Sequence, residues 1–220
     1  MLKVVDLSLQ VRDGTPAPRG KRLVEVNTSF KRPGFWQISW ISMSAHTASH
    51  VDSPLHVIPN SLTIGQIELD KFFGEAVLLD MTDKCSPNCA IELKDIRKFK
   101  EDIRPNDIVV LHTGWGDAKF GVDAYWNDSP YITVEAAEWL CSMSPKAIGF
   151  DFFEEYKARY SDFGADDFVV HKAILGKGII IMEGFANLGK LSKKRFKLFA
   201  VPLKIVDMEA APARFFAIEE

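Results

Sequence analysis

The chain lacks the features that would tie it to a membrane, to nucleic acid or to secretion. None of its apolar runs approaches the roughly 18 residues of a membrane-spanning helix, and its first residues show no signal-peptide pattern. The formal net charge is only −3 and no basic stripe is present, which argues against a nucleic-acid partner. We therefore expect a cytoplasmic protein with no membrane and no nucleic-acid partner.

Cysteine is also scarce, with three residues in a chain of 220. An odd number gives no disulfide framework, and Cys85 and Cys89 have no second Cys or His pair nearby to complete a zinc site. We expect all the thiols to be reduced, as is usual in the cytoplasm.

Length and hydrophobic pattern predict one mixed α/β domain. With 220 residues, 47% of them hydrophobic, and no repeat or long linker, the chain suits a single domain spanning 1–220. The alternation of Trp36, Ile38 and Trp40 predicts a half-buried strand, whereas the later compact apolar runs predict buried strands. Strands are expected at 4–9, 23–26, 36–43, 76–80, 108–112, 147–150, 179–182 and 198–201, and helices at 91–100, 133–143 and 170–176. Early strands followed by strand–helix alternation are typical of a mixed sheet.

Three of the five histidines fall between positions 46 and 56. An extended backbone would point the side chains of His46, His50, Asp52 and His56 the same way, because their offsets are all even. A helix would separate them, and Pro54 would break it. Converging imidazoles and a carboxylate are ligands for a borderline divalent cation such as zinc. The alternative is a histidine-rich surface loop.

Further ligands could come from distant parts of the chain, since Asp52 has two carboxylate oxygens and could bridge a second ion. His171 begins a short predicted helix, and Glu183 ends an apolar strand, where a buried carboxylate needs a partner. Taken alone, either residue is more often capped or salt-bridged than a ligand. His56 is either a ligand or a titratable group beside the metal. His112 is interpreted as structural or as a neighbour of the ligands.

The run from His46 to His56 resembles the signature H-x-G-T-H-x-D-x-P-x-H of the cyclase-like metal-dependent hydrolases. That family includes the bacterial kynurenine formamidases and the isatin hydrolases. The likeness extends over nearly the whole chain, with supporting segments at 6–8, 110–115, 148–151, 170–183 and 207–214. The histidine motif and the pair His171 and Glu183 are specific for this family when they occur together.

By position, the resemblance implies five metal ligands: His46, His50, Asp52, His171 and Glu183. Asp52 would bridge two ions, and His56 would act as catalytic acid and base. Zinc is the implied metal, with manganese as the alternative, and two ions per chain fit the ligand set. The implied fold is a single α/β domain with a mixed, swivelling β/β/α-type sheet, assembled as a homodimer or a larger homo-oligomer.

The activity implied by the resemblance is hydrolysis of a small amide, such as an N-formylkynurenine-type substrate, by metal-activated water. One alternative is the opening of a cyclic amide in the manner of isatin hydrolase. A second is a metal-dependent cyclase or lyase of secondary metabolism, and a third is a metal-stabilised binding protein. His56 argues against the third, because a purely structural site needs no titratable neighbour beyond its ligands.

Three departures from the family pattern leave the substrate open. Ala48 and Ser49 replace the Gly-Thr of the motif, and a different local turn is expected because Ala takes positive φ less easily than Gly. The segment 11–20 carries no Trp that could pack on an aromatic substrate. The segment 151–160 is charged and aromatic, unlike the stretch that follows the corresponding strand in the family.

Overall fold

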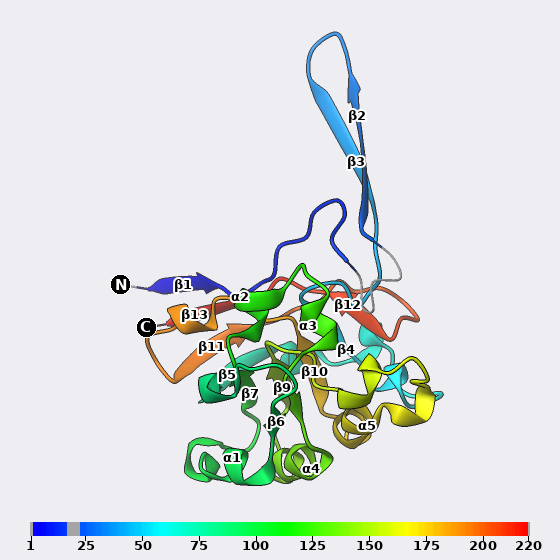
Figure 1. Cartoon of the computed structure of the whole chain (residues 1–220). Helices are drawn as coiled ribbons and strands as arrows, with labels where there is room; N and C mark the ends of the chain where they lie inside the picture. The colour runs from blue at the N-terminus through cyan, green and yellow to red at the C-terminus, as the bar shows by residue number, and fades with distance from the viewer. Residues whose placement is uncertain (1, 17–22, 220) are drawn as a thin grey trace.

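The computed structural model of the chain describes residues 2–16 and 23–219. Within these residues, nine strands form one mixed sheet in the order β1-β13-β11-β5-β7-β9-β10-β4-β12 (Figure 1). Their bounds are β1 Lys3–Asp6, β4 His50–Asp52, β5 Phe73–Asp80, β7 Ile108–His112, β9 Ala147–Phe150, β10 Ile180–Glu183, β11 Arg195–Phe199, β12 Ala210–Pro212 and β13 Phe216–Glu219. The central strands β5, β7, β9 and β10 run parallel, and their outer neighbours pair antiparallel. The mixed α/β fold expected from the sequence is confirmed.

Helices pack on one face of the parallel centre, and the other face is covered by the sheet itself (Figure 1). The helices are α1 Leu93–Arg97, α2 Trp115–Lys119, α3 Ala124–Asn127, α4 Val134–Ser142 and α5 Val169–Leu175. Every residue of β7, β9 and β10 is buried, as expected for parallel strands covered on both faces. On the face away from the helices, Leu198 and Ala217 of the outer strands join Val110 and Met182 in one apolar core. The outer strands therefore curl over the central ones.

Most of the expected elements form close to their predicted positions. The strands at 108–112 and 147–150 agree in both bounds, and the helix at 133–143 forms as α4, with the Thr133 side chain accepting a hydrogen bond from the Ala136 backbone N–H. The strand expected at 198–201 is displaced to Arg195–Phe199. The helix expected at 91–100 shrinks to the five residues of α1. No helix in the described ranges has the length and apolar character needed to cross a membrane.

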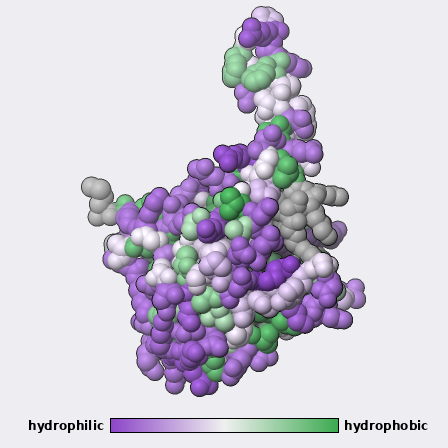
Figure 2. Space-filling model, in the orientation of Figure 1, coloured by the Kyte–Doolittle hydropathy of each residue, from purple (hydrophilic) through white to green (hydrophobic). Residues whose placement is uncertain are grey.

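A two-stranded hairpin stands away from the body of the molecule (Figures 1 and 2). It consists of β2 Glu25–Lys31 and β3 Trp36–Ser42, paired antiparallel. The expectation of a half-buried strand at 36–43 is wrong, because all seven residues of β3 are exposed. The exposed fraction is 50% for Trp36 and 58% for Trp40. Alternation indicates that a strand has two faces, but it does not say what covers the apolar one.

A short two-stranded ladder, β6 Ala90–Ile91 with β8 Tyr131–Ile132, lies beside the helices and runs parallel. The segment 11–20, in which no aromatic residue was found, falls partly on residues 17–22, outside the described part of the chain.

Candidate metal centre

The histidine-rich segment is not one extended strand. His46 lies in a turn, only His50–Asp52 forms strand β4, and Pro54–His56 forms a short 3-10 helix. The expectation of an extended backbone from 46 to 56 is therefore wrong at both ends. Ala48 has φ of 57°, so the chain enters the left-handed region here without glycine, and Pro54 starts the 3-10 helix. The side chains still converge, but because of the turns rather than the even spacing.

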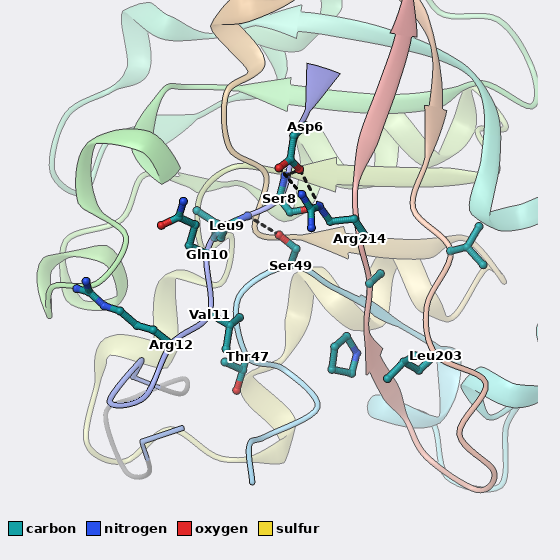
Figure 3. Close-up of a pocket in the computed structure, with 13 residues that line it drawn as sticks. Asp6, Ser8, Leu9, Gln10, Val11, Arg12, Thr47, Ser49, Leu203 and Arg214 are labelled. Carbon is teal, nitrogen blue, oxygen red and sulfur yellow. Dashed lines mark hydrogen bonds and ion pairs between the residues drawn. The ribbon is translucent and has the colours of Figure 1, made fainter. Parts of the chain in front are cut away.

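The turn before β4 is held by Ser49 (Figure 3). The Ser49 hydroxyl donates to the Gly184 carbonyl at 2.6 Å and accepts from the Leu9 backbone N–H at 2.8 Å. Gly184 has φ of 81°, and a Cβ there would collide with the Ala48 carbonyl oxygen. These contacts join the histidine-rich segment to the residue that follows Glu183. The surface pocket drawn in Figure 3 lies against Thr47 and Ser49, and none of the five predicted ligands lines it.

Asp52 lies at the centre of the first group of candidate ligands. Its carboxylate is fully buried, with Oδ1 3.1 Å from His46 Nδ1 and 3.4 Å from His50 Nε2. His50 Nδ1 lies 2.9 Å from the Ala48 carbonyl oxygen, which fits a protonated Nδ1 that donates to it. That hydrogen bond leaves the lone pair of His50 Nε2 directed toward Asp52, as in metal-binding histidines.

The pairing of β4 with β10 brings the distant ligands to Asp52. In this antiparallel register Glu183 lies opposite His50, and Glu183 Oε2 is 3.6 Å from His50 Nε2. His171, on α5, places Nε2 3.1 Å from Glu183 Oε1 and 3.8 Å from Asp52 Oδ2. The five residues assigned as ligands from the sequence thus form one cluster.

His56 lies against this cluster. Its ring centroid is 4.4 Å from that of His46 and 5.3 Å from that of His171, and the edge contact with Phe168 is 5.2 Å. Burial lowers the pKa of His56 to about 4, so the imidazole is neutral at pH 7. His112, the fifth histidine, belongs to none of the metal-binding groups found among the described residues.

Three acidic residues of the cluster were missed in the sequence. Glu154 Oε1 lies 3.4 Å from His171 Nε2, and Glu209 Oε1 lies 3.2 Å from His46 Nε2. Glu155 Oε1 accepts a hydrogen bond from the His171 backbone N–H at 2.8 Å and lies 3.1 Å from His171 Nδ1. The signal for two of them was two successive glutamates soon after a buried apolar strand, in the segment that departs from the family pattern.

The donor set fits divalent cations. Asp52, Glu154, Glu155 and Glu183 are all buried, and burying an ionised carboxylate is costly unless a cation or several hydrogen bonds compensate it. Within the described part of the chain, six buried side-chain atoms of this cluster have no hydrogen-bond partner: His50 Nε2, both Asp52 oxygens, both Glu154 oxygens and Glu155 Oε2. Three groups each bring their donor atoms within 4.8 Å of one another: His46, Asp52 and His56; His50, Asp52 and Glu183; Glu154, His171 and Glu183. A metal could be held by any of the three.

The pKa shifts within the cluster also indicate that it favours bound positive charge. Burial lowers the pKa of His46, but the Asp52 and Glu209 carboxylates outweigh it and raise this pKa to about 10. Burial, together with the neighbouring Glu183, raises the pKa of Glu154 well above its usual range. The excess of carboxylates thus attracts positive charge, whether protons or metal ions.

A mixed, curled sheet with buried imidazoles and carboxylates at the β4–β10 pair defines an α/β protein whose buried groups could hold divalent cations. The family model described as "Putative cyclase" matches residues 5–154, more than half of the chain. The chain therefore belongs to the cyclase family, which confirms the resemblance read from the sequence.

Curated relatives match over almost their full length. Kynurenine formamidase of Erythrobacter litoralis is 28% identical over 220 residues, covering 96% of this chain and 92% of the relative. Cyclase-like protein 1 of Arabidopsis thaliana is 26% identical, covering 99% of this chain and 85% of the relative.

Solved structures share the fold. A structure titled a potential metal-dependent hydrolase with cyclase activity is 25% identical, with a TM-score of 0.78 and coverage of 100% of this chain and 99% of that one. An isatin hydrolase bound to the product analogue thioisatinate has a TM-score of 0.85 at 21% identity, covering 99% of this chain and 92% of that one. At this identity, the likeness to the isatin hydrolase shows only that the two chains share a fold.

Proposed function

We propose that the protein is a metal-dependent hydrolase that cleaves the carbon–nitrogen bond of a small amide. The observation that carries this proposal is the position of the His56 imidazole, whose ring contacts both His46 and His171 beside the buried carboxylates. A site that only binds metal has no use for a titratable group in that position. Relatives named kynurenine formamidase support the reaction class.

The five ligands assigned from the sequence would hold the cations. His46, His50 and Asp52 would take one, and Asp52, His171 and Glu183 would take a second, as the family resemblance implies and as the short distances within each set allow. When bound, divalent cations supply Lewis acidity to the carbonyl group and to water. The mixture of imidazole and carboxylate donors suits zinc, with manganese as the alternative.

In the proposed reaction His56 moves the proton. A water oxygen attacks the amide carbonyl carbon while a ring nitrogen of His56 accepts the proton that the water loses. The carbon–nitrogen bond then breaks, and His56 returns the proton to the leaving nitrogen, giving an amine and a carboxylic acid that loses its remaining proton to solvent at neutral pH. A general acid and base of this kind typically contributes about 10²–10⁴-fold in rate.

The substrate proposed is an N-formyl aryl amide. Phe168 contacts both His56 and His171 at 5.2 Å between ring centroids, and Phe163 packs on Phe168 at 4.6 Å. This aromatic wall beside the proton-transfer group suits a flat aromatic ring. Opening of a cyclic amide is the second candidate, favoured by the fold shared with isatin hydrolase.

A substrate screen tests the proposal. Protein loaded with Zn²⁺ or with Mn²⁺ would be assayed against N-formyl aryl amides, isatin and simple lactones. Turnover of the formyl amides in preference to isatin is expected, and the reverse preference would favour the second candidate. Metal-loaded protein that turns over none of these compounds would contradict a hydrolase function.

We also propose that the protein is a homodimer or a larger homo-oligomer, with a second copy packed on the hairpin of β2 and β3. An isolated two-stranded hairpin is at best marginally stable in water. This one exposes Phe30, Trp36, Ile38, Trp40 and Ile41, and exposed apolar surface of this kind marks a site of interaction with another protein surface.

A further inference from the structure

We propose that Glu154 is a sixth protein ligand, which together with His171 and Glu183 completes the second cation site. The inference rests on the metal-dependent function proposed above and deepens it. It also gives a role to the segment after β9, which departs from the family pattern. Glu155 serves as the positioning residue for His171 in this arrangement.

The first support is the geometry around one imidazole nitrogen. His171 Nε2 lies 3.1 Å from Glu183 Oε1 and 3.4 Å from Glu154 Oε1. The Glu154 side chain is fully buried, and neither of its carboxylate oxygens has a hydrogen-bond partner among the described residues. Donor atoms of these three residues all lie within 4.8 Å of one another. A buried carboxylate in this setting is placed to bind a cation rather than the protein.

The second support is the way His171 is oriented. Glu155 Oε1 lies 3.1 Å from His171 Nδ1 and also accepts the His171 backbone N–H at 2.8 Å. With Nδ1 donating to Glu155, the lone pair of Nε2 faces Glu154 and Glu183. A carboxylate behind a histidine is the usual second partner of a metal-binding imidazole. Of the two successive glutamates, Glu155 thus contacts Nδ1 of the His171 ring and Glu154 lies near Nε2 of the same ring.

The third support is the charge of the cluster. Four carboxylates are buried in it: Asp52, Glu154, Glu155 and Glu183. One divalent cation would compensate two of these formal negative charges, and two divalent cations would compensate all four. Glu219 shows the alternative solution for a buried carboxylate, because Lys3 and the backbone N–H groups of Ser192 and Lys193 all donate to it. Among the residues that the structure describes, Glu154 has no such hydrogen-bond donors, so a second cation is its natural partner.

The test is a calorimetric titration of metal-free protein with Zn²⁺. The parent should bind two ions per chain. In Glu154→Gln the first ion should bind as in the parent, whereas the second should bind at least about tenfold more weakly, since a neutral amide replaces a charged ligand. Glu219→Gln is the matched control, with the same change at a buried carboxylate outside the cluster, and it should bind both ions as the parent does.

Two results would overturn the inference. One is a Glu154→Gln variant that binds two ions with the parent's affinities, and the other is a parent that binds a single ion. If the variant does not fold, a crystal structure of the parent grown with Zn²⁺ decides the matter. A Glu154 oxygen about 2.0–2.2 Å from the second ion supports the inference, and two bound ions that both lie clear of Glu154 refute it.

The titration separates this inference from the proposed function. Two ions that bind with the predicted dependence on Glu154, in a protein that cleaves no amide, would leave the ligand assignment standing and remove the hydrolase proposal. Amide cleavage by the parent, together with a Glu154→Gln variant that binds both ions with the parent's affinities, would leave the hydrolase proposal standing and remove the ligand assignment.

Discussion

The metal centre and the hairpin reverse the usual distribution of polar and apolar groups in opposite ways. The cluster around Asp52 buries four carboxylates and two histidines, His50 and His171, whereas β3 exposes two tryptophans and two isoleucines. Burial of charge is costly, and so is exposure of aromatic surface to water. We propose that each region is compensated by a partner, which is a cation for the cluster and a second copy of the chain for the hairpin.

The largest effect is expected from removing the carboxylate that the two cation sites share. Asp52→Asn keeps the shape of the side chain but removes its charge, so both ions should be lost. Activity should fall by at least about 10⁴-fold, equivalent to ~5 kcal/mol of transition-state stabilisation. Metal content and turnover would be measured on the same preparation. A variant that retains two ions would show that Asp52 does not bridge them.

The second test separates chemistry from metal binding inside the cluster. His56→Ala should lower kcat by about 10²–10⁴-fold while metal content stays near that of the parent. His112→Ala is the control, because this histidine lies outside the metal-binding groups of the described residues, and its kcat should change little. Unchanged turnover in His56→Ala would contradict the proton-transfer role.

The third test addresses the hairpin and leaves the cluster intact. Trp36, Ile38 and Trp40 share one face of β3, so replacing all three by Ser should weaken self-association at least about 100-fold, or ~3 kcal/mol. Light scattering coupled to size-exclusion chromatography would report the change as a shift from oligomer to monomer. The control carries Gln37→Ala and Ser39→Ala on the opposite face and should keep the parent's mass. A parent that is monomeric at all concentrations would contradict the homo-oligomer.

The smallest effect is expected at Glu219, a buried carboxylate that is satisfied by the protein itself. Burial raises the pKa of Glu219, but hydrogen bonds from Lys3 and from the backbone of Lys193 and Ser192 outweigh it and lower this pKa to about 2. Glu219→Gln should reduce the free energy of unfolding by about 1–2 kcal/mol at pH 7.

The pH dependence of that difference follows from the lowered pKa. The ionised carboxylate stabilises the folded state above the ordinary glutamate pKa of 4.5. Its contribution is lost as the pH falls from there toward the folded-state value. Urea unfolding of metal-free parent and Glu219→Gln should therefore give stabilities that converge as the pH is lowered from 6 toward ~3.5. A gap that is independent of pH would show that the effect is packing rather than charge.

The sequence predicted the parts of the molecule that depend on local pattern. Buried parallel strands such as Ile108–His112 are continuous apolar runs, which a sequence shows directly. Candidate ligands could be named from the histidine-rich run at 46–56, where imidazoles and a carboxylate lie close together in the sequence. The convergence of His171 and Glu183 on Asp52 needed the family resemblance, since the β4–β10 register that produces it is a long-range pairing.

The parts that were not predicted depend on contacts between distant segments. Glu154 and Glu155 read as a charged stretch in sequence, and only the fold of the chain places them against His171. The extended backbone expected from 46 to 56 failed because Ala48 takes a positive φ, which a strand pattern does not anticipate. The strand at 36–43 was wrongly expected to be half-buried, because alternation indicates that a strand has two different faces but does not indicate whether either face is covered.

Elemental analysis of the purified protein tests the metal centre most directly. Protein reconstituted with Zn²⁺ or Mn²⁺ and freed of loosely bound metal should contain two divalent ions per chain, and a strong chelator should remove them together with activity. Protein that contains no divalent ion after reconstitution, or that keeps its full activity in the chelator, would contradict the assignment of the buried cluster as a metal centre.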